Sequence, residues 1–211
     1  VTGLVAYGMF SMSFVMEGGQ VVGLTSLGAA VYGSPLKWLV MLSPLAFILV
    51  LSFGIQRMSF GTLQIVFWVF AAAMGVSLAT IFATFSGESI ARVFFITAGT
   101  FAAMSIWGYT TKRDLTKMGS FLIMGLIGII IASVVNIFIG SSAIQFAVSV
   151  IGVIVFTLLT AYDTQRIKNN FLEYREHGEA VAKMAIMGAV SLYLDFINLF
   201  MLLLSLFGNR N

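Results

Sequence analysis

Two aspartates set in apolar sequence are the residues of this chain most able to do chemistry. Asp195 lies in the stretch Ser191–Phe200, inside an apolar run predicted to be helical over 183–207. Asp163 lies near the end of the preceding apolar run, 143–166. An ionisable group at the centre of a membrane helix costs roughly 2.5–3.5 kcal/mol on insertion scales and commonly marks a functional pathway. We therefore expect the two acids to act as a pair, the alternative being a purely structural role for Asp195.

A carboxylate pair in a low-dielectric site has a defined chemistry. Two such groups cannot both ionise cheaply and tend to share one proton. Asp163 and Asp195 are therefore predicted to form a proton sensor. The same two acids would suit a hard divalent cation, because calcium prefers carboxylate and carbonyl oxygens. We accordingly predict a transient calcium site at Asp163 and Asp195.

Two arginines are candidate counter-ions for Asp163. Arg57 follows the second apolar run, and an Arg57–Asp163 ion pair would be a latch that holds only while Asp163 is charged. Arg166 is three residues after Asp163 on the same predicted helix and is the competing partner. The structural alternative pairs Asp163 with Arg166 at a helix end and leaves Arg57 as an anchor at the membrane boundary.

Three further polar residues lie in the apolar runs. Ser191 and Asn198 are one helical turn before and after Asp195, so they share a face with it. Asn136 lies in the run 118–139. We expect these residues to line a polar or ion path, the alternative being hydrogen bonds that join helices.

The composition requires that membrane helices position these residues. Of 211 residues, 60% are hydrophobic and 9% charged, against about 25% charged in a soluble domain. Too few polar residues remain to cover a soluble core. The chain has no cysteine and one histidine, His177, which excludes thiolate chemistry and argues against a histidine metal site or a Ser-His triad. The net charge of +3 lies in short loops, a topology signal and not a nucleic-acid surface.

Apolar runs near 20 residues predict an all-α integral membrane protein with one polytopic membrane domain, 1–211. Val21–Pro35 is expected to be a loop or a short interfacial segment, and Lys168–Gly178 a polar loop. The chain opens at Val1 inside an apolar run, and we expect further residues to precede it. The seven predicted spans are 1–16, 36–55, 63–85, 90–109, 118–139, 143–166 and 183–207.

Lysine and arginine counts predict the orientation. The ends and loops after the second, fourth and sixth spans hold eight of these residues, Arg57, Lys112, Arg113, Lys117, Arg166, Lys168, Arg175 and Lys183. The opposite side holds three, Lys37, Arg92 and Arg210. We therefore expect a cytoplasmic amino terminus and a carboxyl terminus outside.

Four stretches resemble the Bax inhibitor-1 family, also called the transmembrane Bax inhibitor motif proteins, and look like a bacterial member. They span most of the chain, and the last two are the specific ones: Ser89–Thr97, Gly108–Leu115, Thr160–Gln165 and Ser191–Phe200. The resemblance implies seven helices with the last at the centre, wrapped by the other six. It implies a bacterial inner-membrane location and a pH-sensitive calcium leak that needs no cofactor. It also assigns Asp163 and Asp195 as the sensor and Arg57 as the latch.

Two other functions compete with the leak. Relatives described as stress regulators bind membrane proteases, which favours a non-transporting regulator of such partners. An intramembrane aspartyl protease also uses two aspartates, and Tyr162-Asp163 resembles half of its pattern. The other half, Gly-x-Gly-Asp, is absent because Leu192-Tyr193-Leu194 precede Asp195. We therefore expect no enzyme activity.

Overall fold

The computed structural model describes every residue of the chain except 19, 56, 175, 177 and 211. Arg175 and His177 thus lie outside the described residues. Within the described part, six helices are long and apolar enough to cross a membrane. In lipid, backbone groups must be hydrogen-bonded internally, so long apolar runs become helices. The all-α membrane class is confirmed, while the count of seven spans and a central last helix remain predictions.

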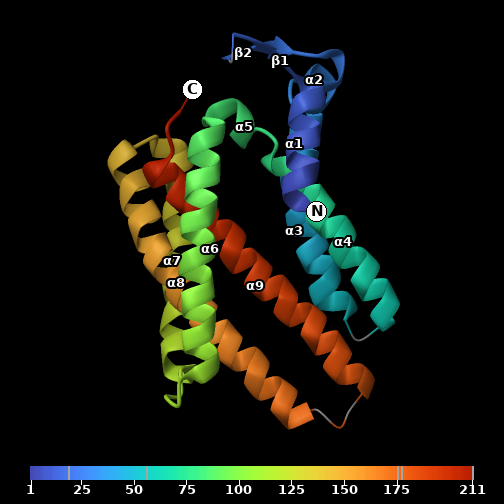
Figure 1. Cartoon of the computed structure of the whole chain (residues 1–211), viewed down its shortest axis with the longest axis vertical. Coiled ribbons are helices and arrows are strands. Elements are labelled where there is room, and N and C mark those ends of the chain that lie inside the picture. The colour runs from blue at the N-terminus through green and yellow to red at the C-terminus, as the bar shows by residue number, and fades with distance from the viewer. Residues whose placement is uncertain (19, 56, 175, 177, 211) are drawn as a thin grey trace. The chain divides into compact units, whose positions relative to one another are not determined.

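The first compact unit comprises Val1–Gly87 and Asn209–Asn211. Its helix α4 packs against α1 and α3. Close approach is possible because Gly75 of α4 faces the backbone of Thr2 and the side chain of Val5. The elements are α1 (Thr2–Ser13), β1 (Phe14–Glu17), β2 (Gln20–Leu24), α2 (Ser26–Val31), α3 (Leu36–Gly54), α4 (Phe60–Leu78) and α5 (Ile81–Thr84) (Figure 1).

Two boundaries in this unit differ from the prediction. The first helix has 12 residues and ends at Ser13, because Phe14 adopts extended backbone and pairs with Leu24. At about 1.5 Å per residue this helix is about 18 Å long, shorter than the ~30 Å hydrocarbon core. The segment 21–35, predicted to be a loop or a short interfacial segment, supplies most of strand β2 and all of α2, so it is not an irregular loop. Gly18, with φ 59°, lies in the turn of this hairpin.

Thr25 joins the hairpin, α1 and α2. Its hydroxyl accepts a hydrogen bond from the Gly28 N–H at 3.1 Å and donates one to the Met12 carbonyl at 2.8 Å. The first bond caps α2, and the second ties that cap to the end of α1. A threonine hydroxyl at a helix N-cap is a typical stabilising group because it satisfies an otherwise unpaired N–H.

We expect Thr25→Ala to lower the free energy of unfolding by about 1 kcal/mol, since it removes both bonds. Denaturant titration in detergent measures the change. Ser11→Ala is the matched control, because the Ser11 hydroxyl is exposed and bonds only the Gly8 carbonyl of its own helix. A Thr25→Ala protein as stable as Ser11→Ala would contradict the capping role.

The second compact unit comprises Glu88–Gly208 and holds the predicted acid pair. Gly140, with φ 67°, ends α7 in the left-handed region that favours glycine and opens the tight turn into α8. The elements are α6 (Gly87–Thr110), α7 (Thr116–Ile139), α8 (Ser142–Tyr174) and α9 (Gly178–Phe207).

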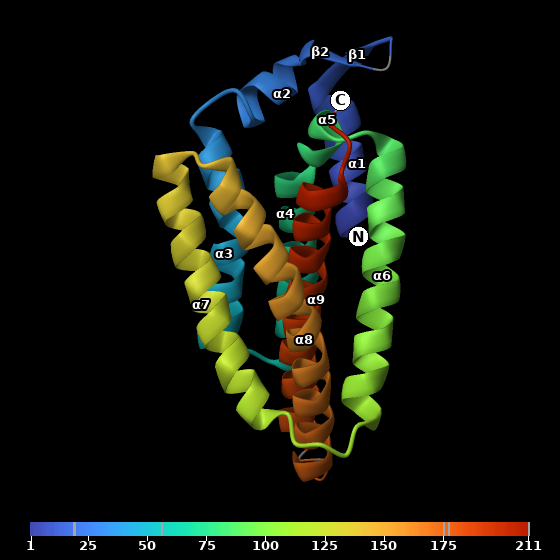
Figure 2. The same ribbon diagram turned by 90° about the vertical axis from the view of Figure 1, so that its left-hand side faces the viewer.

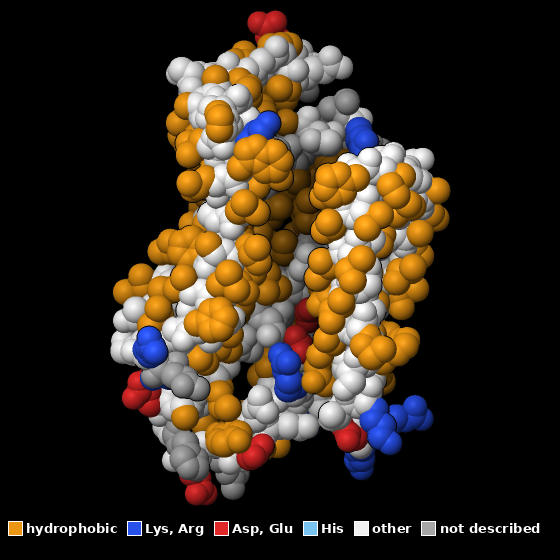
Figure 3. Space-filling model, turned by 180° about the vertical axis from the view of Figure 1, so that it is seen from behind, with side chains coloured by type: hydrophobic (Ala, Val, Ile, Leu, Met, Phe, Trp, Pro, Cys, Tyr) orange, Lys and Arg blue, Asp and Glu red, His pale blue; other side chains and the backbone are white. Residues whose placement is uncertain are grey.

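Helices α8 and α9 are longer than predicted. Helix α8 continues to Tyr174 through the segment predicted as a polar loop, and α9 begins at Gly178 instead of 183. Hydropathy detects the apolar part of a helix, whereas the mostly polar segment 168–174 continues the helix past the apolar run. Hydrophobic side chains cover the sides of the helices, and most charged groups in the view lie toward helix ends (Figure 3). Phe138, 85% exposed, is suited to contact lipid.

The α8–α9 pairing is the most extensive in the unit. The two helices run antiparallel and pack against each other (Figures 1 and 2). Near one end, Ser149 donates a hydrogen bond to Ser205 at 3.4 Å. Near the other end, Arg166 donates one to Ser191 at 3.2 Å. These two contacts fix the register of α9 on α8.

Helix α6 contacts α9 through aromatic rings. Phe196 meets Phe94 and Phe101 edge-on, with ring centroids 5.7 Å and 5.4 Å apart. Phe94 also meets Phe200 at 6.3 Å. Such edge-to-face pairs stabilise beyond the area they bury. These contacts hold α6 against the face of α9 that carries Phe196, the residue next to Asp195 in sequence.

Candidate functional site

The register of α8 on α9 brings the two predicted acids to the same level. Arg166 contacts Ser191. Asp163 lies one turn from Arg166 and Asp195 one turn from Ser191. Asp163 precedes Arg166 on α8, and Asp195 follows Ser191 on α9. Because the helices are antiparallel, both acids are therefore displaced from the Arg166–Ser191 contact in the same direction along the helix pair. The acids therefore lie in the same layer of the α8–α9 pair, where both side chains are buried.

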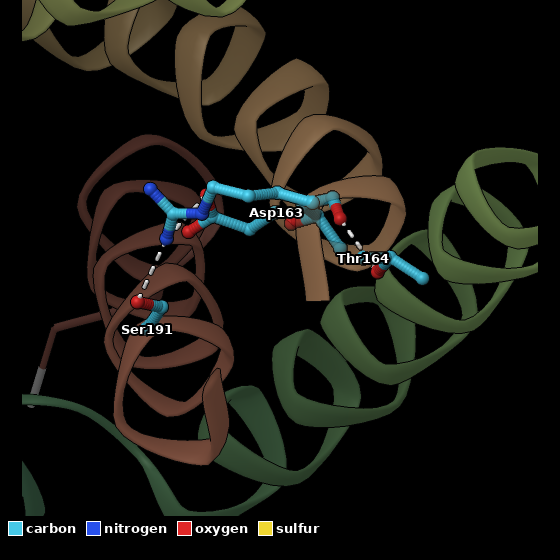
Figure 4. A network of polar contacts seen from close by, with 5 residues as sticks. Asp163, Thr164 and Ser191 are labelled. Carbon is cyan, nitrogen blue, oxygen red and sulfur yellow. Dashed lines mark hydrogen bonds and ion pairs between the residues drawn. The ribbon is translucent and has the colours of Figure 1, made fainter. Parts of the chain in front are cut away.

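The surroundings of the two carboxyl groups differ. Asp163 forms an ion pair with Arg166, whose Nη2 lies 3.0 Å from Asp163 Oδ1. The same Nη2 donates to the Ser191 hydroxyl, so one guanidinium connects α8 to α9 (Figure 4). Asp195 is 5% exposed, and its Oδ2 has no hydrogen-bond partner among the described residues. Both acids are thus buried, but Asp163 is paired with a cation, whereas one oxygen of Asp195 has no hydrogen-bond partner among the described residues.

Tyr162 and Gly119 shape the environment of Arg166. The Arg166 guanidinium lies over the Tyr162 ring, 5.5 Å from its centroid. Gly119, near the start of α7, also lies against this ring, and a Cβ there would overlap the ring atoms. Helix α7 therefore approaches α8 closely at this level, and the cation–π contact adds to the ion pair in placing Arg166.

The loop between α6 and α7 is attached to α8 beside the acid pair. Gln165 is buried; its Oε1 accepts from the Leu115 N–H at 2.9 Å and its Nε2 donates to the Arg113 carbonyl at 2.8 Å. Lys168 Nζ donates to the Tyr109 carbonyl at 2.8 Å. Sequence reasoning missed these contacts. Its only available signal was a polar amide two residues after Asp163 in apolar sequence.

Asp114, in this loop, stays charged. Its carboxylate accepts hydrogen bonds from the Thr116 hydroxyl at 2.6 Å and from the Thr116 N–H at 2.9 Å. These bonds, the hydroxyl first, hold the pKa of Asp114 below its ordinary value. The loop therefore presents Asp114 as an anion beside the exposed Lys112 and Arg113.

The other predicted site residues lie apart from the acid pair or bond locally. The Asn198 amide donates to the Leu194 carbonyl of its own helix at 2.8 Å. Asn136 accepts from the Ser141 N–H at 2.9 Å in the α7–α8 turn, at the far end of α8 from Asp163. Arg57 is exposed in the turn after α3 and belongs to the first unit, so its pairing with Asp163 remains a prediction.

The two carboxyl groups alone make a small ligand set for a metal ion. In the described part of the chain, no group of three or more His, Cys, Asp or Glu side chains could hold a metal ion. Asp163 and Asp195 offer oxygen ligands of the kind that calcium prefers. A calcium ion here would need its remaining ligands from water or backbone carbonyls.

The fold and site define a multi-pass helical membrane protein with an acid pair buried between its last two long helices. The sequence profile described as "Inhibitor of apoptosis-promoting Bax1" matches residues 1–211. The chain therefore belongs to this family, the Bax inhibitor-1 family. The match confirms the resemblance inferred from the four sequence stretches.

Bacterial relatives share much of the chain. Protein RP147 of Rickettsia prowazekii (strain Madrid E), named as uncharacterized, is 50% identical over 82% of this chain and 72% of its own length. Inner membrane protein YbhL of Escherichia coli (strain K12) is 49% identical over 80% of this chain and 73% of its own length. An uncharacterized protein of Caulobacter vibrioides is 42% identical over 100% of this chain and 83% of its own length.

Proposed function

We propose that this protein is a pH-sensitive calcium leak of a bacterial inner membrane, in which Asp163 and Asp195 are the proton sensor. The observation that carries the proposal is the buried pair itself. Two acids on antiparallel helices occupy one layer of the α8–α9 interface, and Arg166 neutralises only one of them. Buried ionisable groups in membrane helices commonly mark ion or proton paths. The printed name of the YbhL relative supports the location.

Proton uptake would act through the ion pairs of Asp163. A protonated Asp163 loses most of its attraction for Arg166, and for Arg57 if the latch forms. Arg166 also bonds Ser191, so its release frees a cross-link between α8 and α9. Protonation at the same time removes negative charge that attracts cations. The two effects oppose each other, and flux measurement decides which of them sets the direction of gating.

The decisive experiment is calcium flux into proteoliposomes across pH 5–8. We expect the wild type to leak with a pH-dependent rate. Asp163→Asn and Asp195→Asn should each flatten this dependence, because neither amide takes up a proton in this range. Glu179→Gln is the control, since Glu179 pairs with Lys183 at the start of α9 and lies outside the acid pair.

Two results discriminate between functions. Unchanged pH dependence in both aspartate variants would exclude the acid pair as the sensor. Absence of flux, together with stoichiometric co-purification of a membrane protease, would favour a non-transporting regulator. For the pH step to act from the cytoplasm, the amino terminus should lie inside, as the lysine and arginine counts predict.

A further inference from the structure

We propose that Gln165 is a positioning residue of the acid pair, which it serves by fixing the α6–α7 loop and the start of α7 onto α8. The pair's role as a pH sensor rests on the proposed function. The attachment itself rests on geometry alone. Gln165 is separated from its partner Leu115 by 50 residues in sequence.

Both ends of the Gln165 amide bond to one short stretch of backbone. Its oxygen accepts from the Leu115 N–H and its nitrogen donates to the Arg113 carbonyl, so it brackets Asp114 on both sides. A carboxamide has one acceptor and one donor end, and each meets its complement here, which fixes the orientation of the amide. The side chain is 8% exposed, so an apolar replacement would leave two backbone groups without a partner.

The bracketed loop leads directly into the residues around Arg166. Leu115 is buried, and its carbonyl accepts from the Gly119 N–H in the first turn of α7. Gly119 lies against the Tyr162 ring, and the Arg166 guanidinium lies over the same ring. A loop detached from Gln165 would let the start of α7 withdraw from Tyr162. Arg166 would then lose one of the surfaces that hold it beside Asp163.

The proposal predicts that the electrostatic surroundings of the acids depend on an uncharged residue. Gln165 itself cannot titrate, so any effect must act through Arg166 and the loop. Among the described residues, the charged and titratable groups near this level of the unit are Tyr162, Asp163, Arg166 and Lys168 on α8, Tyr193 and Asp195 on α9, Lys117 on α7, and Tyr109, Lys112, Arg113 and Asp114 on the end of α6 and the loop.

The first measurement is hydrogen exchange of the full chain in lipid nanodiscs. Gln165→Met keeps a linear side chain of similar length but removes both hydrogen bonds. We expect amides of the loop 111–115 to exchange at least ~10-fold faster in this variant, because the Leu115 N–H loses its partner. Asn169→Met, on an exposed site one turn further along α8, is the matched control and should leave this exchange unchanged. Gln165→Glu retains an acceptor for Leu115 and should restore part of the protection.

The second measurement separates positioning from simple support of the fold. Infrared titration follows the carbonyl band of protonated carboxylic acid, assigned by its loss in Asp163→Asn and Asp195→Asn. We expect Gln165→Met to displace the pH midpoint of this band by about half a unit or more, while Asn169→Met leaves it in place. The band reports on the acids without any transport measurement.

Different outcomes test the attachment of the loop, the positioning role of Gln165 and the proposed leak. Unchanged exchange in Gln165→Met would overturn the attachment, and faster exchange with an unmoved midpoint would overturn the positioning role. A displaced midpoint in a protein without calcium flux would sustain the positioning role and contradict the proposed leak. A band that survives in both aspartate variants would overturn the acid pair and the positioning role together.

Discussion

Gly108→Ala is expected to destabilise the second unit by about 1–3 kcal/mol or more, which is the range for forced overpacking. Gly108 of α6 lies against the backbone of α8, where an added Cβ would overlap the carbonyl oxygen and Cα of Ala161. A flexible side chain could move aside, but backbone cannot move without shifting a helix. Ala161 lies two residues before Asp163, so this shift would also displace the acid. Thermal or denaturant unfolding in detergent measures the loss.

Gly99→Ala provides the control on the same helix. A Cβ at Gly99 meets no heavy atom within 4 Å. Alanine is a better helix former than glycine, so this variant should be neutral or more stable by up to about 1 kcal/mol. Equal effects of the two substitutions would contradict the close α6–α8 approach.

The second large effect is expected at Asp195, and it is a gain in stability. Asp195→Leu replaces a buried carboxyl, one oxygen of which has no partner among the described residues, by an apolar group of similar shape. Replacing buried charged groups by packed hydrophobic ones is often neutral or stabilising by about 1–4 kcal/mol. We expect Asp195→Leu to unfold at a higher denaturant concentration than the wild type and to lose the pH dependence of calcium flux.

Asn136→Leu tests the reason for that gain. Asn136 is also buried, but its side chain accepts a hydrogen bond from the Ser141 N–H. Its replacement leaves a backbone donor unpaired and should cost about 1–3 kcal/mol. If both leucine variants were destabilised alike, Asp195 would be a structural residue with partners of its own, and a functional explanation for its burial would be unnecessary.

Apolar run length predicted the six helices that are long and apolar enough to cross a membrane, because a bilayer core requires such runs. It did not predict the strand at Phe14, since Phe14, Val15 and Met16 continue the apolar run 1–16 and their pairing with β2 depends on a turn that hydropathy does not detect. Nor did it predict that α8 extends to Tyr174, since a helix beyond the lipid needs no apolar residues.

The acid pair was recognisable from sequence because Asp163 and Asp195 are the two acids within apolar runs. Whether they meet depended on depth, which the predicted start of the last helix at 183 left open. The Arg166–Ser191 contact resolves it by fixing the register. The role of Gln165 was not predictable, because its partners are backbone groups of a distant loop and carry no signature in their own side chains.

The length of α8 bears on the side of the membrane from which a proton would reach Asp163. Its 33 residues measure about 50 Å, well beyond a hydrocarbon core of ~30 Å. Counted from Ser142, Asp163 lies about 32 Å along the helix axis. If the bilayer begins at Ser142 and α8 runs along its normal, Asp163 lies at the opposite boundary of the hydrocarbon core, and three further turns of α8 lie outside it. In the proposed sensor, protons would then reach Asp163 from one aqueous phase only, and the acidity of the opposite phase would have little influence on the flux.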